Sequence, residues 1–449
     1  MPMRDTTSRT TRRTSPEGVR LGERLRQLRV AAGLTQSELA GDRFSKEYVS
    51  QIERGKTRPT AGTIEWLADR LGVDAGFLGS GVATDERARL EGALTRAEAL
   101  YEAQEDEEAV EAFEPLPAAA RATGVPELQV RALVGAGLAK MRVGDHRAAL
   151  ALLNDARAIS ETGSFSDVER ADVLLRLGGC RVMLSSIQTA LGLLNEALLL
   201  AERSGLPCDA LKANILSWRA RCWLIQRDYE AAKEDVERAL ELAHAVDDLR
   251  TVGAAYFQAS LVADREGRWV LARNYAERAR QAYAELSDRV HVGQLTNNLG
   301  GLNFLLGNTD DAIELLKEAF SIALEAGQDA DAGRAVSSLA QVHLRTGNVE
   351  QAEEQARHAL ELLDGRVDYV DETGNAQLVL GRALLEQGRL EEAEAAFAVA
   401  ESSFGDLGSA SHRAAAWMAR GDLAARRGEH ERAAELYRTA AEALQDVRF

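Results

Sequence analysis

Proline and long apolar runs are scarce in this chain of 449 residues. Only 7 prolines occur, and none follows Pro207. Because proline breaks the interior of a helix, the second half of the chain can form long continuous helices, which argues against a loop-rich enzyme. No run approaches the ~18 apolar residues of a membrane span, and the N-terminus lacks the apolar core of a secretory signal. We therefore expect neither a membrane segment nor export.

Cysteine is also rare. Cys180, Cys208 and Cys222 form neither a CxxC pair nor an even disulfide set, which suits a reducing cytoplasm, the location that we predict. Cys222, beside Trp223, is expected to be a packed thiol, with a redox-sensing thiol as the alternative.

Signatures of catalysis and of cofactor binding are missing as well. No HExxH motif, His/Cys metal spacing, phosphate-binding glycine loop or GxSxG turn occurs. The 7 histidines are scattered along the chain. We therefore expect no metal, no cofactor and no enzymatic activity.

Charge is distributed unevenly. The net charge is −17, but residues 1–81 contain 14 Lys and Arg against 10 Asp and Glu, whereas residues 82–449 contain 40 against 61. A basic N-terminal part on an acidic body indicates that a polyanion such as nucleic acid would meet the N-terminal part alone.

The N-terminal part has the pattern of a helix-turn-helix. Residues 1–18 are rich in Thr and Arg and lack an apolar face, so they are predicted to be a disordered basic tail, and residues 19–79 follow as a folded domain. Thr35 and Glu38 form a capping box for one short helix, and Ser45 can cap the next. Two short helices joined by a tight turn fit the major groove of DNA. A plain bundle of four or five helices is the alternative.

The segments LTQSELA, SKEYVSQIERGKTRPT and IEWLADRLGV, between residues 34 and 73, resemble the lambda-repressor-like, or XRE-type, DNA-binding family. The resemblance implies base contacts from the start of the recognition helix and phosphate contacts around it. The implied DNA-binding residues are Gln36 on the preceding helix, Lys46, Glu47, Ser50 and Gln51 on the recognition helix, and Arg54, Lys56 and Arg58 after it.

Some of these residues have simpler alternatives. Lys46 would donate to guanine and Glu47 would accept from cytosine, but Glu47 can also be a solvated first-turn acid that favours the helix dipole. Glu53 is interpreted as structural, because phosphates repel a carboxylate. The turn before Ser45 is one residue shorter than the commonest form of the family, which leaves the individual base contacts open.

The rest of the chain repeats itself. Turn positions recur every 40–41 residues, and Ala stands five residues after each one. Seven residues before the last eight turns the residue is small except at Arg219, and twelve residues after them it is Ala except at Arg238. Small residues at fixed places let antiparallel helices approach closely, and such pairs stack into a solenoid. The turn positions are Gln104, Gly144, Ser185, Gln226, Gly267, Gly307, Gly347, Gly388 and Gly428.

This pattern resembles the tetratricopeptide repeat, although the period is longer than the usual 34 residues and the proline at the repeat end is missing. The predicted fold is all-α, with an N-terminal helix-turn-helix bundle, a linker at residues 80–86, and a right-handed α-solenoid of about nine helical hairpins at residues 87–449. Four tryptophans are expected to pack between helices rather than to form a ligand cage: Trp218, Trp223, Trp269 and Trp417.

The concave face of such a solenoid is a candidate ligand surface. Early repeats are apolar at the positions expected there, whereas later repeats carry amides and arginines, and amide side chains can bond an extended peptide backbone. Merely solvated helix faces are the alternative. The candidate residues are Gln294, Asn297, Arg334, Ser337, Gln341, Asn375 and Arg382.

The layout resembles that of the peptide-pheromone receptor regulators, in which a repeat domain binds an oligopeptide and controls DNA binding. The sequence therefore predicts a sequence-specific, homodimeric transcription regulator that binds double-stranded DNA and senses an oligopeptide or a protein partner. The alternative is a protein-interaction scaffold that its head recruits to DNA.

Overall fold

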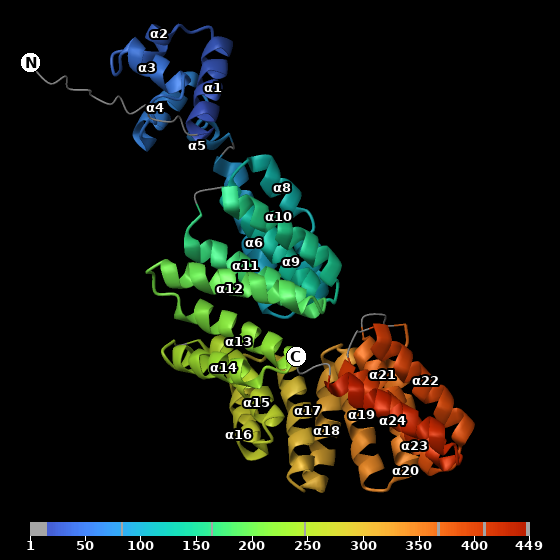
Figure 1. Cartoon of the computed structure of the whole chain (residues 1–449). Coiled ribbons are helices and arrows are strands. Elements are labelled where there is room, and N and C mark those ends of the chain that lie inside the picture. Colours follow the sequence, from blue (N-terminus) through green and yellow to red (C-terminus); the bar gives the residue numbers. More distant parts are fainter. Residues whose placement is uncertain are drawn as a thin grey trace, which may run out of the picture. The chain divides into compact units, whose positions relative to one another are not determined.

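The computed structural model describes residues 16–81, 84–162, 165–246, 248–365, 369–406 and 410–445. These ranges contain helices and no strand, which confirms the all-α prediction (Figure 1). The chain divides into two compact units, residues 1–176 and 177–449. Unit 1 contains the helix-turn-helix head and the first hairpins, and unit 2 contains the later hairpins.

Five helices form the head, around a core that includes the fully buried side chains of Leu25, Val49 and Ile52. Gly22 lies where the first helix crosses the third, and a Cβ there would stand 2.5 Å from the carbonyl oxygen of Ile52. Only glycine allows this approach. The helices are α1 (Pro16–Ala31), α2 (Gln36–Ala40), α3 (Lys46–Glu53), α4 (Ala61–Leu71) and α5 (Ala75–Ser80).

The start of the head differs from the prediction. α1 begins at Pro16, so residues 16–18 are helical and do not belong to the predicted tail. Proline suits the first helical position, because the N–H that it lacks would have no partner there and its fixed φ is already helical. The remainder of the predicted tail, residues 1–15, lies outside the described residues.

The predicted linker at residues 80–86 is also too long. The helix α6 (Thr84–Glu102) includes its last three residues, and residues 82–83 lie outside the described ranges. Asp85 and Glu86 occupy the first turn of α6, where the positive end of the helix dipole favours acidic side chains. Asp74, which caps α5, also accepts a hydrogen bond of 2.9 Å from the backbone N–H of Thr84.

Nine helical hairpins follow within the described residues, as expected. In unit 1 they are α6 with α7 (Asp106–Phe113) and α9 (Pro126–Arg142) with α10 (His146–Thr162), separated by the extra helix α8 (Leu116–Thr123). The others are α11 (Asp167–Met183) with α12 (Ile187–Arg203), α13 (Asp209–Gln226) with α14 (Tyr229–His244), α15 (Leu249–Arg265) with α16 (Trp269–Glu285), α17 (Arg289–Leu305) with α18 (Thr309–Glu325), α19 (Asp329–Arg345) with α20 (Val349–Leu362), α21 (Val370–Glu386) with α22 (Leu390–Asp406), and α23 (Ala410–Arg426) with α24 (His430–Gln445).

A residue with positive φ marks the turn of each hairpin and corrects the predicted register at one of them. Between α13 and α14 this residue is Arg227, with φ of 62°, and not the predicted Gln226. Moving the register by one residue removes both exceptions in the repeat pattern, because Ala220 replaces Arg219 and Ala239 replaces Arg238. Both alanines are fully buried. The turn residues are Gln104, Gly144, Ser185, Arg227, Gly267, Gly307, Gly347, Gly388 and Gly428.

The small residue seven positions before each turn lets the two helices of a hairpin touch. A Cβ on Gly381 would lie 2.4 Å from the ring of Phe397, which is fully buried. In the last hairpin a Cβ on Gly421 would lie 2.5 Å from the ring of Tyr437. The first helix of a hairpin therefore forms a notch that a large side chain of the second helix fills.

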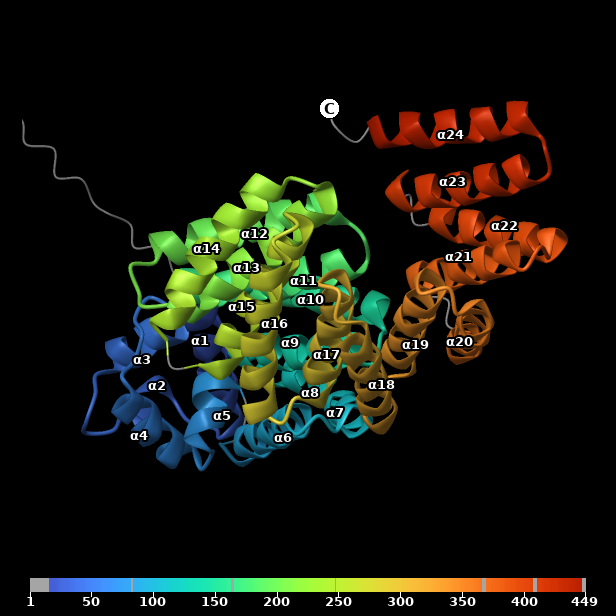
Figure 2. The ribbon, with the colours of Figure 1, turned by 90° about the horizontal axis from the view of Figure 1, so that it is seen from below.

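The first helices of neighbouring hairpins in unit 2 also pack on one another, α13 on α15, α17 on α19, α19 on α21 and α21 on α23. Figures 1 and 2 show these hairpins stacked as successive pairs. Because the inner side of a curved stack is the shorter side, the direct packing places the first helices on the concave side of unit 2. We call the surface that they present there the inner face.

Ion pairs and hydrogen bonds join the outer helices to the next hairpin. Glu353, on α20, accepts hydrogen bonds of 2.8 Å from Arg357 and of 2.7 Å from both Gln387 and Arg389, which lie in the turn between α21 and α22. Burial alone would raise the pKa of Glu353, but these three donors lower it to about 2. The carboxylate therefore stabilises the junction of two hairpins.

Replacing Glu353 with Gln should destabilise unit 2 by ~1–2 kcal/mol at neutral pH, because the charged acceptor of three donors is lost. The folded-state pKa of Glu353 lies below its usual value of 4.5, so its contribution is complete above about pH 4.5 and is lost as the pH falls toward 2. Urea denaturation between pH 7 and pH 3 should show the wild type and Glu353→Gln converging at low pH. Glu350→Gln, an exposed change on the same helix, is the control, and a pH-independent difference would contradict the assignment.

Candidate functional site

Side-chain caps fix the two short helices of the head, as the sequence predicts. The Thr35 hydroxyl accepts a hydrogen bond of 3.2 Å from the Glu38 backbone N–H, and the Glu38 carboxylate accepts one of 2.7 Å from the Thr35 N–H. The Ser45 hydroxyl accepts a hydrogen bond of 3.1 Å from the Tyr48 N–H. Helices this short are unstable alone, so these caps define where α2 and α3 begin.

The short turn between α2 and α3 is held by α4. Gly41 has φ of 52°, and a Cβ on it would lie 3.0 Å from the guanidinium carbon of Arg70. Arg70 donates hydrogen bonds of 3.0 and 2.9 Å to the carbonyl of Glu38. The ring of Phe44, in the turn, meets the ring of Trp66 edge to face at 5.1 Å. The turn thus has one defined shape, which orients α3.

Helix α3 has one buried and one exposed face. Val49 and Ile52 are fully buried. The predicted base-contacting residues lie on the opposite side, at the spacing that forms one stripe on a helix, and all are exposed except the half-buried Ser50. This stripe consists of Lys46, Glu47, Ser50 and Gln51, and it continues to Arg54, the C-cap of α3, which was predicted to bind phosphate.

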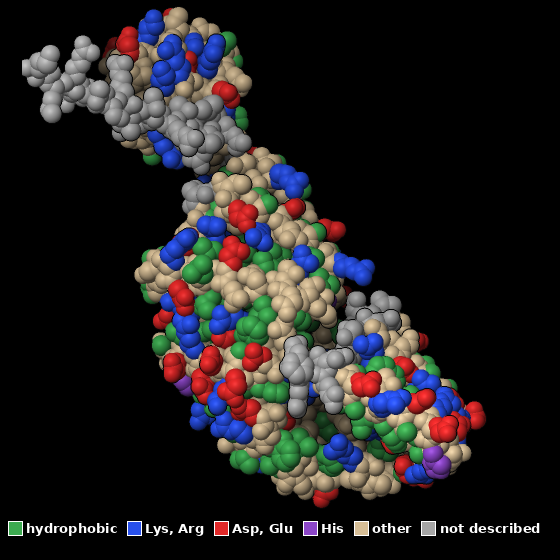
Figure 3. All heavy atoms as spheres, viewed as in Figure 1, with side chains coloured by type: hydrophobic (Ala, Val, Ile, Leu, Met, Phe, Trp, Pro, Cys, Tyr) green, Lys and Arg blue, Asp and Glu red, His purple; other side chains and the backbone are tan. Residues whose placement is uncertain are grey.

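The loop after α3 adds cations beside this stripe. Lys56 and Arg58 are exposed, and the Thr57 hydroxyl between them donates a hydrogen bond of 3.0 Å to the Gln51 side chain. Figure 3 shows Lys and Arg side chains gathered on the visible face of the head. The structure therefore brings seven of the eight predicted DNA-binding residues onto α3 and the adjoining loop.

Gln36, the eighth predicted residue, takes part in a network beneath α3. Its side-chain amide donates a hydrogen bond of 2.7 Å to Glu53. Glu53 also receives the guanidinium of Arg29, with 2.6 and 3.2 Å between the paired atoms, and Arg29 donates a further hydrogen bond of 2.7 Å to the carbonyl of Leu34. The side chain of Glu53 is only 4% exposed. The structural interpretation of Glu53 is confirmed.

Sequence reasoning missed Arg29 and Arg70 as positioning residues of the head. A signal for Arg29 was present, because it stands four residues after the core residue Leu25 and so faces the core from α1. Arg70 gives no such signal, because its partner is a backbone carbonyl.

Replacing Glu53 with Gln should destabilise the head by ~3 kcal/mol, because the guanidinium of Arg29 is then left almost buried without its counter-charge. Hydrogen exchange measured by mass spectrometry should show faster exchange in peptides from α1 to α3, while exchange in α19 to α22 stays unchanged. The double variant Arg29→Met with Glu53→Leu should recover part of the loss, because it removes both charges. If the amides of α1 to α3 exchange as slowly in Glu53→Gln as in the wild type, the ion pair of Arg29 and Glu53 does not hold the head together.

Several predicted ligand residues of the inner face are engaged by the protein itself. Gln294 donates a hydrogen bond of 2.9 Å to Asp331 of the next first helix, and Arg334 donates one of 2.6 Å to Glu372 of the one after. Asn375 donates one of 3.2 Å to Asp371 on its own helix. These contacts join neighbouring hairpins or brace one helix.

The other predicted residues divide into buried and accessible ones. Ser337 is buried. Asn297 is half-buried, and its side-chain oxygen is itself buried and has no hydrogen-bond partner among the described residues, so a ligand would reach it only by displacing its neighbours. Gln341 is exposed and Arg382 is half-buried, with burial lowering the pKa of Arg382. Asn297, Gln341 and Arg382 are therefore the predicted residues that keep bonding capacity for a ligand.

Arg221 is an inner-face residue that the sequence reasoning missed. It stands six residues before the turn residue Arg227, as Gln341 and Arg382 stand six residues before theirs. The one-residue error at Gln226 had hidden this equivalence, and only the positive φ of Arg227 reveals it.

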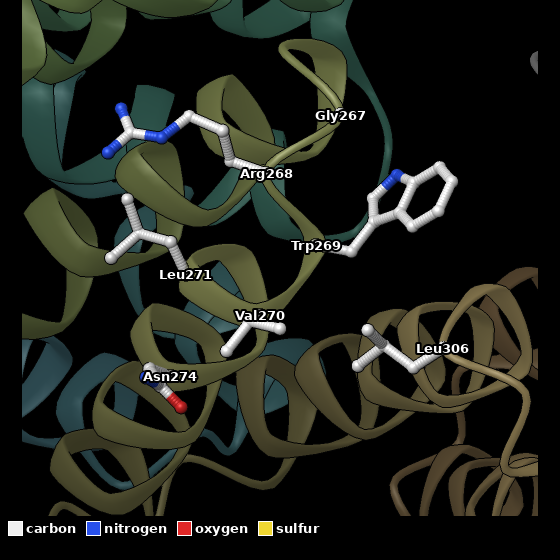
Figure 4. Close-up of a pocket in the computed structure, with 7 residues that line it drawn as sticks. All are labelled: Gly267, Arg268, Trp269, Val270, Leu271, Asn274 and Leu306. Carbon is white, nitrogen blue, oxygen red and sulfur yellow. The ribbon is translucent and has the colours of Figure 1, made fainter.

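A separate apolar pocket corrects the prediction for Trp269. The pocket has a volume of about 410 Å³ and lies at the start of α16 (Figure 4). Trp269 lines it together with Val270 and Leu306, and Trp269 is 38% exposed. As the first residue of α16, Trp269 has no helix turn before it to cover its ring, so it does not pack between helices.

The other predictions for Trp and Cys agree with the structure. Trp218, Trp223 and Trp417 are half-buried, and the indole N–H of Trp223 donates a hydrogen bond of 3.1 Å to Asp235. Cys222 is fully buried, and burial raises the pKa of its thiol to about 12. A thiol with this pKa is protonated at neutral pH, which confirms the packed thiol and argues against a redox sensor.

The described residues hold no group of three His, Cys, Asp or Glu placed to bind a metal ion. Within the same ranges, no helix combines the length and apolar character that crossing a bilayer requires.

The head and the hairpins together define a helix-turn-helix protein with helical repeats. The family described as helix-turn-helix domain matches residues 20–76, and tetratricopeptide repeat families match residues 291–365, 331–404 and 378–446.

Relatives of known name match the head. The HTH-type transcriptional regulator DdrOP3 of Deinococcus deserti is 40% identical over 65 residues, which are 14% of this chain and 50% of that protein. The uncharacterized HTH-type transcriptional regulator y4dJ of Sinorhizobium fredii is 44% identical over 54 residues, 12% of this chain and 70% of that protein. The chain thus spans half the length of the first relative and 70% of the second. It belongs to the XRE-type helix-turn-helix transcriptional regulators and carries C-terminal tetratricopeptide repeats.

Solved structures resemble the chain in fold. A Rap protein in complex with Competence and Sporulation Factor has a TM-score of 0.55 and 15% identity, and the match covers 80% of this chain and 98% of that one. The signal transduction ATPase PH0952 of Pyrococcus horikoshii, which has a tetratricopeptide repeat sensor, has a TM-score of 0.55 and 14% identity, with 95% of this chain and 64% of that one covered. These similarities establish the α-solenoid fold.

Proposed function

We propose that this regulator reads an operator with the exposed stripe of α3 and senses a ligand with the inner face of unit 2. The observation that carries the first part is the stripe from Lys46 to Arg54, on a helix whose start and orientation are fixed. Lys46 would donate to guanine, Glu47 would accept from cytosine, and the Gln51 amide would meet a base edge one turn later.

The cations at the end of the stripe have a different role in this proposal. Arg54, Lys56 and Arg58 would bind phosphates, which sets the position of the head on the duplex but reads no sequence. Glu53 does not oppose them, because Arg29 neutralises it in the interior of the head. Gln36, bonded to Glu53, would support these contacts from beneath α3.

A homodimer is the assembly that we propose. Heads of this family bind paired half-sites, and two recognition helices would enter the major groove about one turn, ~34 Å, apart. A protein that acts on the chromosome would work in the cytoplasm, and we propose that it does so as a regulator and not as an enzyme.

The double variant Lys46→Ala with Gln51→Ala should lose the preferred site while keeping weak binding to any DNA, because it removes base contacts and leaves the phosphate contacts. Genome-wide footprinting of wild type and variant, followed by binding assays on the best site, should show a palindromic site for the wild type and a loss of ~10-fold or more in affinity for the variant.

Lys56→Ala is the matched control for a phosphate contact. It should weaken binding to all sequences alike. It should also reduce, by about 1, the steepness with which the logarithm of the binding constant falls with the logarithm of the salt concentration. Binding that is indifferent to sequence in both the wild type and the double variant would contradict operator reading. The head would then serve only to dock the protein on DNA, and the protein-interaction scaffold would be the better interpretation.

An oligopeptide is the ligand class that the inner face favours. Asn297 has a buried acceptor without a partner, and Gln341 is exposed on the next hairpin. Amides of this kind can both donate to and accept from an extended backbone. A Rap protein of the same fold holds Competence and Sporulation Factor, which supports ligand binding by such repeats. A ligand that prefers one curvature of the solenoid would shift the spacing of the two heads.

The apolar pocket favours a protein partner as the second candidate ligand. Trp269, Val270 and Leu305 are exposed in and beside this pocket, and exposed aromatic and aliphatic side chains that lie together often mark an interaction site.

Short peptides of random sequence, mixed with the full chain, should yield a retained subset after size exclusion, identified by mass spectrometry. The double variant Asn297→Ala with Gln341→Ala should retain these peptides ~10-fold less well, because two amide contacts are lost. Gln281→Ala, on the outer helix α16, is the control and should retain them like the wild type. Equal retention by all three proteins, or none by the wild type, would contradict a peptide site on the inner face.

A further inference from the structure

Arg221 is a half-buried cation on the inner face of unit 2. It belongs to α13, at the repeat position that Gln341 and Arg382 occupy in later hairpins. Among the described residues, its guanidinium has no carboxylate within ion-pair distance and no hydrogen-bond acceptor. Its guanidinium carbon lies over the ring of Trp218, 5.6 Å from the ring centroid, and this cation–π contact holds the group in place.

Two other arginines of unit 2 are matched by carboxylates. Arg219, two residues earlier, forms a two-pronged ion pair with Asp235, with 2.7 Å between one pair of atoms. Arg334, on α19, lies 2.9 Å from Asp331 and 2.6 Å from Glu372. Arg221 differs from both of these arginines in lacking a counter-charge.

The surroundings of Arg221 disfavour its charge. Burial lowers the pKa of Arg221, and the positive charge of Arg334 lowers it further. Removing a charge from water without a partner costs free energy, and an anion placed against the guanidinium would offset that cost. Arg221 is thus a half-buried cation on an aromatic ring that lacks a negative partner.

We propose that Arg221 forms a carboxylate-binding subsite on the inner face, and that this subsite anchors the carboxylate of a peptide ligand. A planar guanidinium binds a carboxylate through two parallel hydrogen bonds, which fixes the direction of the ligand as well as its charge. The identity of the ligand as a peptide rests on the proposed function, whereas the subsite itself does not.

The first experiment tests the subsite without a peptide. N-acetylglycine, a small carboxylate that imitates the end of a peptide, is added to the full chain, and saturation-transfer NMR measures its binding. The wild type should give a signal that is lost in Arg221→Gln and kept in Arg238→Gln, which removes one exposed cation from the outer helix of the same hairpin. N-acetylglycinamide, which has no charge, should give no signal. A signal that is equal in the wild type and in Arg221→Gln, or no signal in any protein, would overturn the proposal.

The same variant carries a stability readout that guards against misfolding. Without ligand, Arg221→Gln should melt at the same temperature as the wild type or higher, because an unmatched charge is removed. A clearly lower melting temperature would mean that Arg221 is paired within the fold, and it would overturn the proposal.

The second experiment asks where the carboxylate comes from. Two random peptide pools are compared, one with free C-termini and one with C-terminal amides. Retention of the free pool alone assigns the C-terminal carboxylate, and retention of amidated peptides rich in Asp and Glu assigns a side chain. In either case Arg221→Gln should bind the retained peptides about 10- to 100-fold more weakly. Peptides that bind the wild type and Arg221→Gln equally well would overturn the proposal. If no peptide is retained but N-acetylglycine binds through Arg221, the peptide function fails and the carboxylate subsite stands.

Discussion

The contact on which the repeats depend is the close approach of two helices at a single small residue. At Gly381 a Cβ would lie 2.4 Å from the ring of Phe397, so the notch and the ring that fills it are parts of one contact. The same notch recurs seven residues before the other hairpin turns, as glycine, alanine or serine. Because it fixes how the two helices of a hairpin are rotated about their axes, it also fixes which residues of the first helix face the next hairpin and which face the concave side.

This dependence explains how much of the repeat fold follows from sequence alone. Alanines and glycines at fixed offsets from a turn predict hairpins, their number and their approximate bounds. The exception is the turn between α13 and α14, which the sequence places at Gln226. The residue with positive φ is Arg227, in the place that glycine holds in most other turns. Arginine gives no sign of that conformation, so the register moved by one residue. On a helix, one residue is a rotation of about 100°, and it hid Arg221 from the list of inner-face residues.

In the head, the sequence predicts local structure better than the contacts that orient it. Capping by Thr35 and Ser45 follows from residues three positions apart, and the structure confirms both caps. The orientation of α3 depends instead on Arg29 and Arg70, whose partners lie 24 and 32 residues away along the chain. Spacing rules carry no information on such distant pairs. The base contacts of Lys46 and Glu47 remain proposals for the same reason, since they depend on the angle of α3 against DNA.

The hairpins of the inner face differ from one another in the charged residues around equivalent positions, and these differences determine its chemistry. One position of the first helix carries Arg221 on α13 and Arg382 on α21, with equal placement in the repeat. Burial lowers the pKa of both arginines. At Arg382 the nearby Asp422 partly offsets this effect and Arg345 adds to it, whereas at Arg221 the charge of Arg334 adds to it. A solenoid built from identical hairpins would present identical groups and could not bind one end of a ligand in preference to the other. An unmatched cation such as Arg221, near matched ones such as Arg219, gives the surface a direction, which a peptide needs if its sequence is to be read.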